Sequence, residues 1–436
     1  MSLLKIKDNR TNKKILFSDI PKIVDKVANK TLEQLERAGI FIFPEHLKNA
    51  DDLTKDQMIL QEVNDSFRTG NIMGFIGCGN ERLIIESRFS QNEDYFFQYL
   101  LDKVLNFPNI VDLNSDSEQS QRLFNFLIFL FPHYLKTAMR KGIFKKYIRQ
   151  EYNNDNIRGT VDITRHIKLN TPFIGNVAYN QREFSCDNYV TEIVRHTIEF
   201  IRKKSYGKIL LAKVKDEVRL IAESTPKYRQ CDRQKIIETN KKNILRHAYF
   251  REYILLQRLC ILILQNRKYQ TGSGTNKIYG ILFDGAWLWE EYVNSLIKEK
   301  FYHPMNKKSS GAQRLFSGNS GIIYPDFISC DTDERIIADA KYKPLENIGN
   351  KDYLQLLAYM FRFDAKKGYY LYPEVEDIAD CKMWLNSGST FENNVTPRKN
   401  ICVTKHGLKI PINAKNYEDF LAMIKSSEFN FLKIFI

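Results

Sequence analysis

Apolar and polar positions alternate near the C-terminal end of the chain in an order that predicts two short strands joined by a tight turn. Residues 322–329 are apolar apart from one acid, residues 331–334 (DTDE) contain nothing apolar, and residues 335–341 are again largely apolar. Two apolar runs separated by a cluster of turn-forming residues are typical of a β-hairpin. The pattern therefore predicts a hairpin whose strands carry acids in otherwise apolar surroundings.

The predicted hairpin gathers charged side chains on one face. With Thr332 and Asp333 at the tip, counting outward places Asp326 opposite Asp339, at a side-chain separation of about 5 Å. Lys341 lies two residues beyond Asp339 and so points the same way. Two close carboxylates repel unless a cation lies between them, and hard oxygen ligands that leave room for water suit Mg²⁺, with Mn²⁺ as a substitute. Lys341 would then orient or deprotonate a water, or steady the charge on a phosphate. A surface hairpin with a ladder of charges is the plain alternative.

Two amphipathic segments flank the hairpin and carry further polar groups. Residues 286–300 (AWLWEEYVNSLIKEK) predict a helix that bears Glu290 and Glu291, and a solvated helix face explains either acid equally well. Residues 351–363 predict a second helix, on which Gln355 and Tyr359 share a face because they are four residues apart. An acid, a charged hairpin and a Gln/Tyr pair in this order form a constellation, which is more specific than any one motif.

The remaining pattern predicts an α+β N-terminal region, a helical middle region and a C-terminal α/β domain, with boundaries at residues 1–145, 146–275 and 276–436. Helices are expected at residues 55–67, 95–105, 122–140, 187–204, 208–222, 248–265 and 417–425. Strands are expected as a hairpin at 72–76 and 82–88, a short strand at 158–163, a third C-terminal strand at 366–373, and a hairpin at 401–404 and 408–411. Polar residues 112–121 and glycine-rich residues 271–276 predict connecting segments.

Composition and charge favour a polyanionic partner. The chain has 436 residues, of which 43% are hydrophobic and 27% charged, as in ordinary globular proteins. Its net charge is +14, which favours partners such as DNA, although a lysine-rich organism would produce the same excess. Residues 140–152 interleave cations with aromatics, a pattern of nucleic-acid contact that packing in a core explains as well.

Several sequence signals exclude other classes. The seven cysteines form no CxxC pair, which indicates a reducing cytoplasm and argues against structural zinc. The longest apolar run, residues 126–131, is too short to span a bilayer, and the N-terminus lacks the apolar core of a signal peptide. No phosphate-binding G-x-x-x-x-G-K-[ST] motif occurs, so any nucleotide-driven work needs a second chain.

The motifs above resemble a known family. Pro325-Asp326 followed by Asp339-Ala340-Lys341 resembles the PD-(D/E)xK nuclease core, and the Gln355 to Tyr359 segment resembles the QxxxY helix of its RecB-like branch. The LWEEYV-type helix, DAKYK and QLLAY are most similar to the McrC family, the nuclease subunit of McrBC and LlaJI-type restriction systems. RGTVD at residues 158–162 and FSCDN at 184–188 extend the resemblance upstream.

The resemblance implies a restriction-endonuclease-like C-terminal domain with a mixed central sheet flanked by helices. It implies Mg²⁺-dependent cleavage of DNA within a hetero-oligomer, in defence against foreign DNA, with a McrB-like AAA+ NTPase that uses GTP or ATP and docks on the N-terminal region. Glu290 matches the acid of the family's helix and would join Asp326 and Asp339 on the metal. The site residues implied are Asp326, Asp339, Lys341, Glu290, Gln355 and Tyr359.

Two alternatives stay open from the sequence. A stand-alone repair or recombination nuclease of the same fold would cut DNA with Mg²⁺ but without a partner or NTP. A non-catalytic regulator that stimulates a ring NTPase and only holds DNA would be unaffected by loss of Asp339. The intact set of Asp326, Asp339 and Lys341 counts against the regulator.

Overall fold

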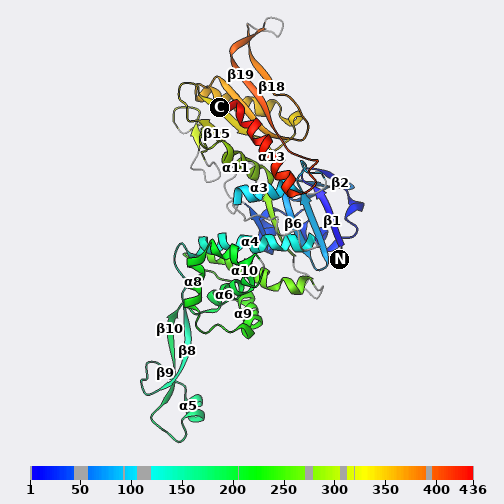
Figure 1. The fold of residues 1–436 in the computed structure, drawn as a ribbon. Coiled ribbons are helices and arrows are strands. Elements are labelled where there is room, and N and C mark those ends of the chain that lie inside the picture. Colours follow the sequence, from blue (N-terminus) through cyan, green and yellow to red (C-terminus); the bar gives the residue numbers. More distant parts are fainter. Residues whose placement is uncertain are drawn as a thin grey trace. The chain divides into compact units, whose positions relative to one another are not determined.

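The structure is a computed structural model that describes residues 2–43, 57–91, 94–105, 119–204, 206–270, 278–304, 312–318, 320–388 and 395–435 (Figure 1). It forms two compact units, one made of Met1–Val111 with Gly272–Ile436 and the other of Asp112–Thr271. This grouping differs from the three consecutive domains expected at residues 1–145, 146–275 and 276–436. The expected connection at 271–276 and most of that at 112–121 lie outside the described residues.

A five-stranded sheet accounts for the difference, because it combines both ends of the chain. Its order is β1 (Ser2–Lys7), β7 (Glu81–Glu86), β6 (Ile72–Cys78), β11 (Ile278–Asp284) and β3 (Ile40–Phe43). Strand β11 runs antiparallel to β6 and parallel to β3. Every residue of β11 is buried, so this strand requires a neighbour on each side. It finds both in the N-terminal segment rather than in the C-terminal sheet.

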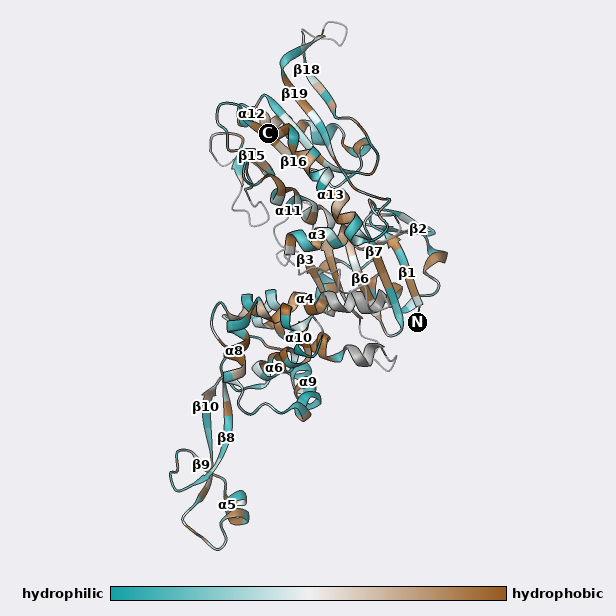
Figure 2. Ribbon diagram, viewed as in Figure 1, coloured by the Kyte–Doolittle hydropathy of each residue, from teal (hydrophilic) through white to brown (hydrophobic). Residues whose placement is uncertain are grey.

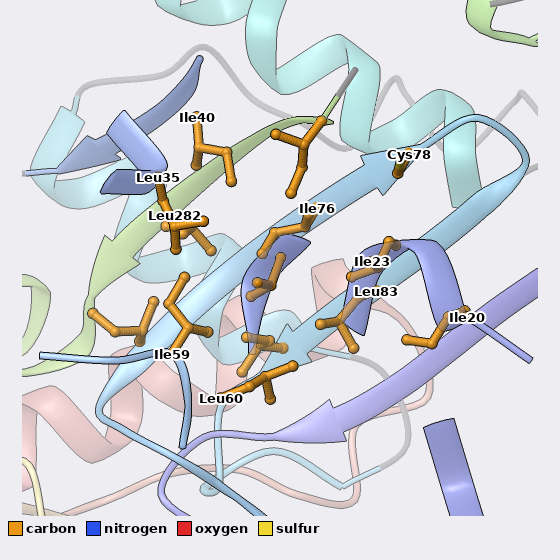
Figure 3. Packing of buried hydrophobic residues seen from close by; sticks show 14 of the residues in the cluster. Ile20, Ile23, Leu35, Ile40, Ile59, Leu60, Ile76, Cys78, Leu83 and Leu282 are labelled. Atoms are coloured by element: carbon orange, nitrogen blue, oxygen red, sulfur yellow. The ribbon is translucent and has the colours of Figure 1, made fainter. Parts of the chain in front are cut away.

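The core of this sheet lies under two short helices, α1 (Pro21–Val27) and α2 (Leu32–Ala38). Figure 3 shows the packing of side chains from these helices and from the strands, among them Ile23, Leu35, Ile76, Leu83 and Leu282. The predicted hairpin at 72–76 and 82–88 is confirmed as β6 and β7.

The predicted helix at 55–67 is wrong within the described residues, which form β4 (Leu60–Val63) and β5 (Ser66–Thr69). Asn64 has a φ of 51° between these two strands. Asparagine tolerates this left-handed conformation, which suits a hairpin turn.

The second unit is a helical layer with a β-arm. Its helices are α4 (Gln119–Met139), α6 (Tyr189–Arg202), α7 (Gly207–Ala212), α8 (Lys215–Ser224), α9 (Arg233–Lys242) and α10 (Glu252–Gln270). Helix α10, which confirms the helix predicted at residues 248–265, contacts α4, α6 and α9. The one helix expected at 208–222 is two, α7 and α8.

The arm corrects the prediction of a helical middle region with only one short strand, at residues 158–163. It consists of β8 (Lys146–Asn154), β10 (Val177–Ser185), β9 (Thr160–Val161) and helix α5 (Ile163–Leu169). Burial alternates along β8 with a period of two, and aromatic pairs such as Tyr152 and Tyr179, 5.5 Å apart between ring centroids, join β8 to β10. Such cross-strand pairs stabilise a ribbon without a deep core. Figure 2 shows hydrophobic residues on α5, and Ile163 and Ile167 there are exposed.

The C-terminal segment forms a six-stranded mixed sheet, as predicted. Its order is β12 (Phe301–Tyr302), β15 (Phe327–Ser329), β16 (Ile336–Ala340), β17 (Lys367–Glu374), β19 (Val395–Lys409) and β18 (Cys381–Gly388). Helices α11 (Gly285–Ile297) and α12 (Asn350–Arg362) contact β16, and α13 (Tyr417–Leu432) contacts β19.

The third strand predicted at 366–373 is confirmed as β17, but the hairpin at 401–404 and 408–411 is wrong. Residues 401–409 belong to one long strand, β19, because Lys405 to Gly407 continue the parallel pairing with β17 without a turn. Among the described residues, no helix combines the length and the apolarity that a membrane span requires.

Candidate active site

The β15–β16 hairpin has the register that the sequence predicts. Phe327 pairs with Ala338 and Ile328 with Ile337, so one step outward sets Asp326 opposite Asp339. The turn is closed by the Asp331 carboxylate, which accepts hydrogen bonds from the backbone N–H groups of Asp333 at 2.9 Å and Glu334 at 3.3 Å. The hairpin therefore brings both acids to one end of the two strands.

Asp326, Asp339 and Lys341 converge at this end. The Lys341 ammonium lies 2.7 Å from Asp339 Oδ2, with 17% and 3% of the two side chains exposed. Asp326 Oδ2 accepts a hydrogen bond of 2.8 Å from the backbone N–H of Ala340, between the other two residues. The backbone N–H of Lys341 donates to Leu371 on β17 at 2.9 Å, which ties the end of β16 to the sheet.

The site holds more negative than positive charge. Burial raises the pKa of Asp326 well above its usual value, and the nearby carboxylates of Asp339 and Glu290 raise it further, while Lys341 opposes them. Burial disfavours the charge on Lys341, but Asp339 and Asp326 outweigh this effect and raise the pKa of its ammonium. The lysine therefore stays a cation, and the raised pKa of Asp326 shows that the neighbouring acids repel its negative charge. This is the electrostatic setting in which a carboxylate pair recruits a metal ion.

Helix α12 supplies the predicted glutamine and tyrosine. Gln355 Nε2 donates to the Tyr359 hydroxyl at 2.7 Å, and Gln355 Oε1 lies 3.4 Å from the Lys341 ammonium. Burial raises the pKa of Tyr359 to about 12, so its hydroxyl stays protonated at neutral pH. The structure thus brings both residues to the hairpin site, where contacts run from Tyr359 through Gln355 to Lys341.

Helix α11 places Glu290 close enough to act on the pKa of Asp326, and His303, which directly follows β12 and which the sequence analysis missed, lies beside it. His303 Nδ1 lies 2.8 Å from the backbone oxygen of Asp326, and His303 Nε2 lies 3.6 Å from Glu290 and 3.9 Å from Glu291. Burial alone would lower the pKa of His303, but the nearby carboxylate of Glu291, the Asp326 carbonyl and the carboxylate of Glu290 raise it. A single histidine beyond the end of a helix has no spacing pattern that would reveal it.

Asp352 is a second residue that the sequence analysis missed. Its carboxylate lies 2.8 Å from the Lys343 ammonium and 3.9 Å from that of Lys341. Although burial opposes this, the Lys343 hydrogen bond lowers the pKa of Asp352. Its position three residues before Gln355 on the same helix was the available signal. Lys343 is therefore engaged by Asp352, and it is not presented freely to a phosphate backbone.

The donor set fits magnesium through two carboxylates. Among the described residues, no group of three or more His, Cys, Asp or Glu side chains is placed to hold a metal ion. Mg²⁺ commonly binds through one or two carboxylates and keeps several waters or takes substrate phosphate oxygens. Asp326 and Asp339 offer that donor set, and Glu290, the third ligand that the resemblance implies, stays a prediction.

The two upstream motifs have structural roles. In RGTVD, Gly159 leaves no room for a Cβ, which would lie 2.1 Å from the Asn180 carbonyl oxygen, and Asp162 caps α5. In FSCDN, the buried Asn188 caps α6 and its amide also donates to the backbone oxygens of Phe144, Ser185 and Cys186. These motifs therefore build the arm and its attachment to the helices.

Comparisons with known proteins place the chain among components of restriction systems. Residues 67–373 match the family model described as the McrBC 5-methylcytosine restriction system component. The match spans more than half of the chain, and the protein belongs to this family. No curated protein matches the chain.

Two solved structures are similar to the chain. One is a half-complex from the tetradecameric assembly of Thermococcus gammatolerans McrB AAA+ hexamers with bound McrC, with a TM-score of 0.46, 14% identity and coverage of 98% of this chain and 100% of that chain. The other, the McrBC complex of the same organism, has a TM-score of 0.30, 14% identity and coverage of 68% and 87%. Because both TM-scores lie below 0.5, neither likeness supports a conclusion about activity or partners.

Proposed function

We propose that this protein is the DNA-cleaving subunit of a McrBC-type restriction system, and that it hydrolyses phosphodiester bonds with Mg²⁺ at the hairpin site. The observation that carries the proposal is the convergence of Asp326, Asp339 and Lys341, with Lys341 2.7 Å from Asp339. Family membership supports the restriction setting. The mixed sheet with its flanking helices has the form expected of a PD-(D/E)xK domain.

The protein's own residues have separable roles in this proposal. Asp326 and Asp339 would hold Mg²⁺, which supplies a Lewis acid and a nucleophilic water when bound. Lys341, a permanent cation in this field, would stabilise the charge that develops on the phosphate. Gln355 and Tyr359 would orient Lys341 and the attacking water through their 2.7 Å hydrogen bond. Glu290 and His303 would hold the Asp326 side of the site.

The partner would be a McrB-like AAA+ NTPase ring, fuelled by GTP or ATP, in a cytoplasmic hetero-oligomer that defends against foreign DNA. The chain has no phosphate-binding loop of its own, which is consistent with a second chain as the motor. The N-terminal region remains the docking surface expected from the resemblance. The arm offers exposed apolar residues as well, including Ile163, Phe173 and Ile174, and such patches often mark protein contacts.

A cleavage assay tests the proposal. The full chain is mixed with the McrB-like NTPase proposed as its partner, NTP and methylated or unmethylated plasmid, with either Mg²⁺ or EDTA. Cutting that needs Mg²⁺ and is lost in Lys341→Met supports the proposal. Mg²⁺-dependent cutting without partner or NTP would instead indicate a stand-alone repair nuclease. Stimulation of the NTPase without any cutting, equal in wild type and Lys341→Met, would indicate a non-catalytic regulator.

A further inference from the structure

Tyr342 directly follows Lys341 and is committed to a different part of the molecule. Lys341 faces Asp339 and Gln355, whereas Tyr342 is 4% exposed and packs against the N-terminal segment. The backbone between these two residues is therefore held by the candidate site on one side and by the N-terminal sheet on the other.

The Tyr342 hydroxyl is the centre of a buried hydrogen-bonded chain. It lies 2.8 Å from Ser87 Oγ and donates to the sulfur of Met73 at 3.3 Å. Ser87 Oγ in turn accepts from the backbone N–H of Phe89 at 3.2 Å, and the Phe89 ring meets the Tyr342 ring edge-on at 5.1 Å. These contacts determine both the depth and the rotation of the tyrosine ring.

Arg88 covers the ring and is itself fixed from two sides. Its guanidinium lies 4.8 Å from the centroid of the Tyr342 ring. Arg88 Nη2 lies 2.8 Å from Asp8 Oδ2 and donates to Asn71 Oδ1 at 2.5 Å. The side chains of the Arg88–Asp8 pair are only 5% and 0% exposed. Because desolvation offsets most of the attraction in a buried ion pair, such a pair contributes defined geometry more than stability.

The start of α11 rests on the same ring. A Cβ at Gly285 would lie 2.7 Å from Tyr342 Cε1, so only glycine allows this approach. The backbone N–H of Gly285 donates to the Asn71 carbonyl oxygen at 2.8 Å. Helix α11 carries Glu290, and Lys341 directly precedes Tyr342. The two segments that carry these charged residues therefore meet at the Tyr342 ring. We call Asp8, Asn71, Arg88, Gly285 and Tyr342 the Tyr342 junction.

We propose that Tyr342 is a positioning residue, through which the N-terminal sheet holds Lys341 and the start of α11 in the geometry that the candidate site requires. The inference rests on the proposed function for the meaning of that geometry. It predicts that a change at Arg88, in the N-terminal segment, is felt at the hairpin site.

Hydrogen exchange of the full chain tests this coupling without relying on cleavage. Arg88→Lys keeps the charge but removes the planar group that covers the ring and forks to Asp8 and Asn71. We expect roughly tenfold faster exchange in peptides covering residues 336–343 and 284–291, with no change in 395–409. Arg37→Lys is the matched control, because Arg37 lies on the surface with 75% of its side chain exposed. Faster exchange confined to the N-terminal segment, or spread over the whole chain, overturns the inference.

Cleavage provides the second readout. Tyr342→Phe removes only the hydroxyl, and Gly285→Ala pushes on the ring from the other side. Both are expected to lower kcat by roughly tenfold to a hundredfold, the cost of displacing a reacting group by about an ångström, with KM for DNA within about twofold. Tyr302 lies on β12 of the C-terminal sheet and is 59% exposed, so Tyr302→Phe is expected to match the wild type. If the wild type cuts and both junction variants cut equally well, the inference about Tyr342 fails while the proposed function stands. If the wild type does not cut, the proposed function fails and the exchange result still decides the coupling.

Discussion

Asp339→Asn tests the site most directly, because it removes one charge at nearly constant volume. Asp339 is 2% exposed, and its carboxylate is shared between Lys341 and the proposed metal. A bound metal contributes several kcal/mol of transition-state stabilisation. Loss of about 4 kcal/mol corresponds to roughly a thousandfold in kcat. We therefore expect DNA cleavage by Asp339→Asn to fall by about that factor.

Stability is expected to change far less than activity. Breaking a buried ion pair commonly costs about 3–5 kcal/mol, because the remaining charge is left unpaired. Here Asp352 remains 3.9 Å from the Lys341 ammonium, and Asp326 lies close enough to act on its pKa. The repulsion between Asp339 and Asp326 also disappears. The expected loss in the free energy of unfolding is thus about 1–2 kcal/mol, below the cost of an isolated broken pair.

The assay measures plasmid cleavage with Mg²⁺ and, on the same preparations, urea unfolding without Mg²⁺. Asp333→Asn is the matched control, since Asp333 lies exposed at the tip of the same hairpin and should keep wild-type cleavage. Retention of more than about a tenth of the wild-type kcat by Asp339→Asn would refute the catalytic assignment, because a tenfold change is only about 1.4 kcal/mol. An equal loss of cleavage and folded protein would refute the separation of activity from stability.

Three further predictions concern single groups. Tyr359→Phe removes the acceptor of the Gln355 hydrogen bond, so kcat should fall about tenfold while KM for DNA, measured in the same titration, stays constant. Burial raises the pKa of Asp94 from 3.8 to about 7, so the stability from its native-state proton is complete below pH 3.8 and is lost as pH rises through 7. Across that window, urea titrations should show the free energy of unfolding of the wild type falling by about 1.4 kcal/mol per pH unit more than that of Asp94→Asn, because other buried acids such as Asp8 titrate in both proteins. Asn188→Ala should destabilise by about 2–3 kcal/mol in chemical unfolding, against about 1 kcal/mol for the exposed cap Asn416→Ala, because Asn188 is buried and its amide serves several backbone groups; equal losses would contradict this account.

Much of the candidate site was predictable because its geometry is local. The positions of Asp326 and Asp339 follow from counting outward from Thr332 and Asp333, since side chains alternate strictly along a strand and the observed register agrees. The Gln355–Tyr359 pair follows from the helical period in the same way. His303 was not predictable as a site residue, because its partners lie on other elements, whereas Asp352 carried one signal, its position three residues before Gln355 on the same helix.

The sequence by itself therefore determined the charged hairpin and the faces of the helices beside it, because each depends on periods of two or 3.6 residues within a short window. The mixed C-terminal sheet was implied only by the family resemblance. Only the tertiary structure decided that β11 joins the N-terminal sheet, that β19 runs as one strand, and that Tyr342 is buried against Arg88. Those outcomes depend on which distant surfaces can bury one another. A run of apolar residues predicts that the segment is buried, but it does not predict which other segment covers it.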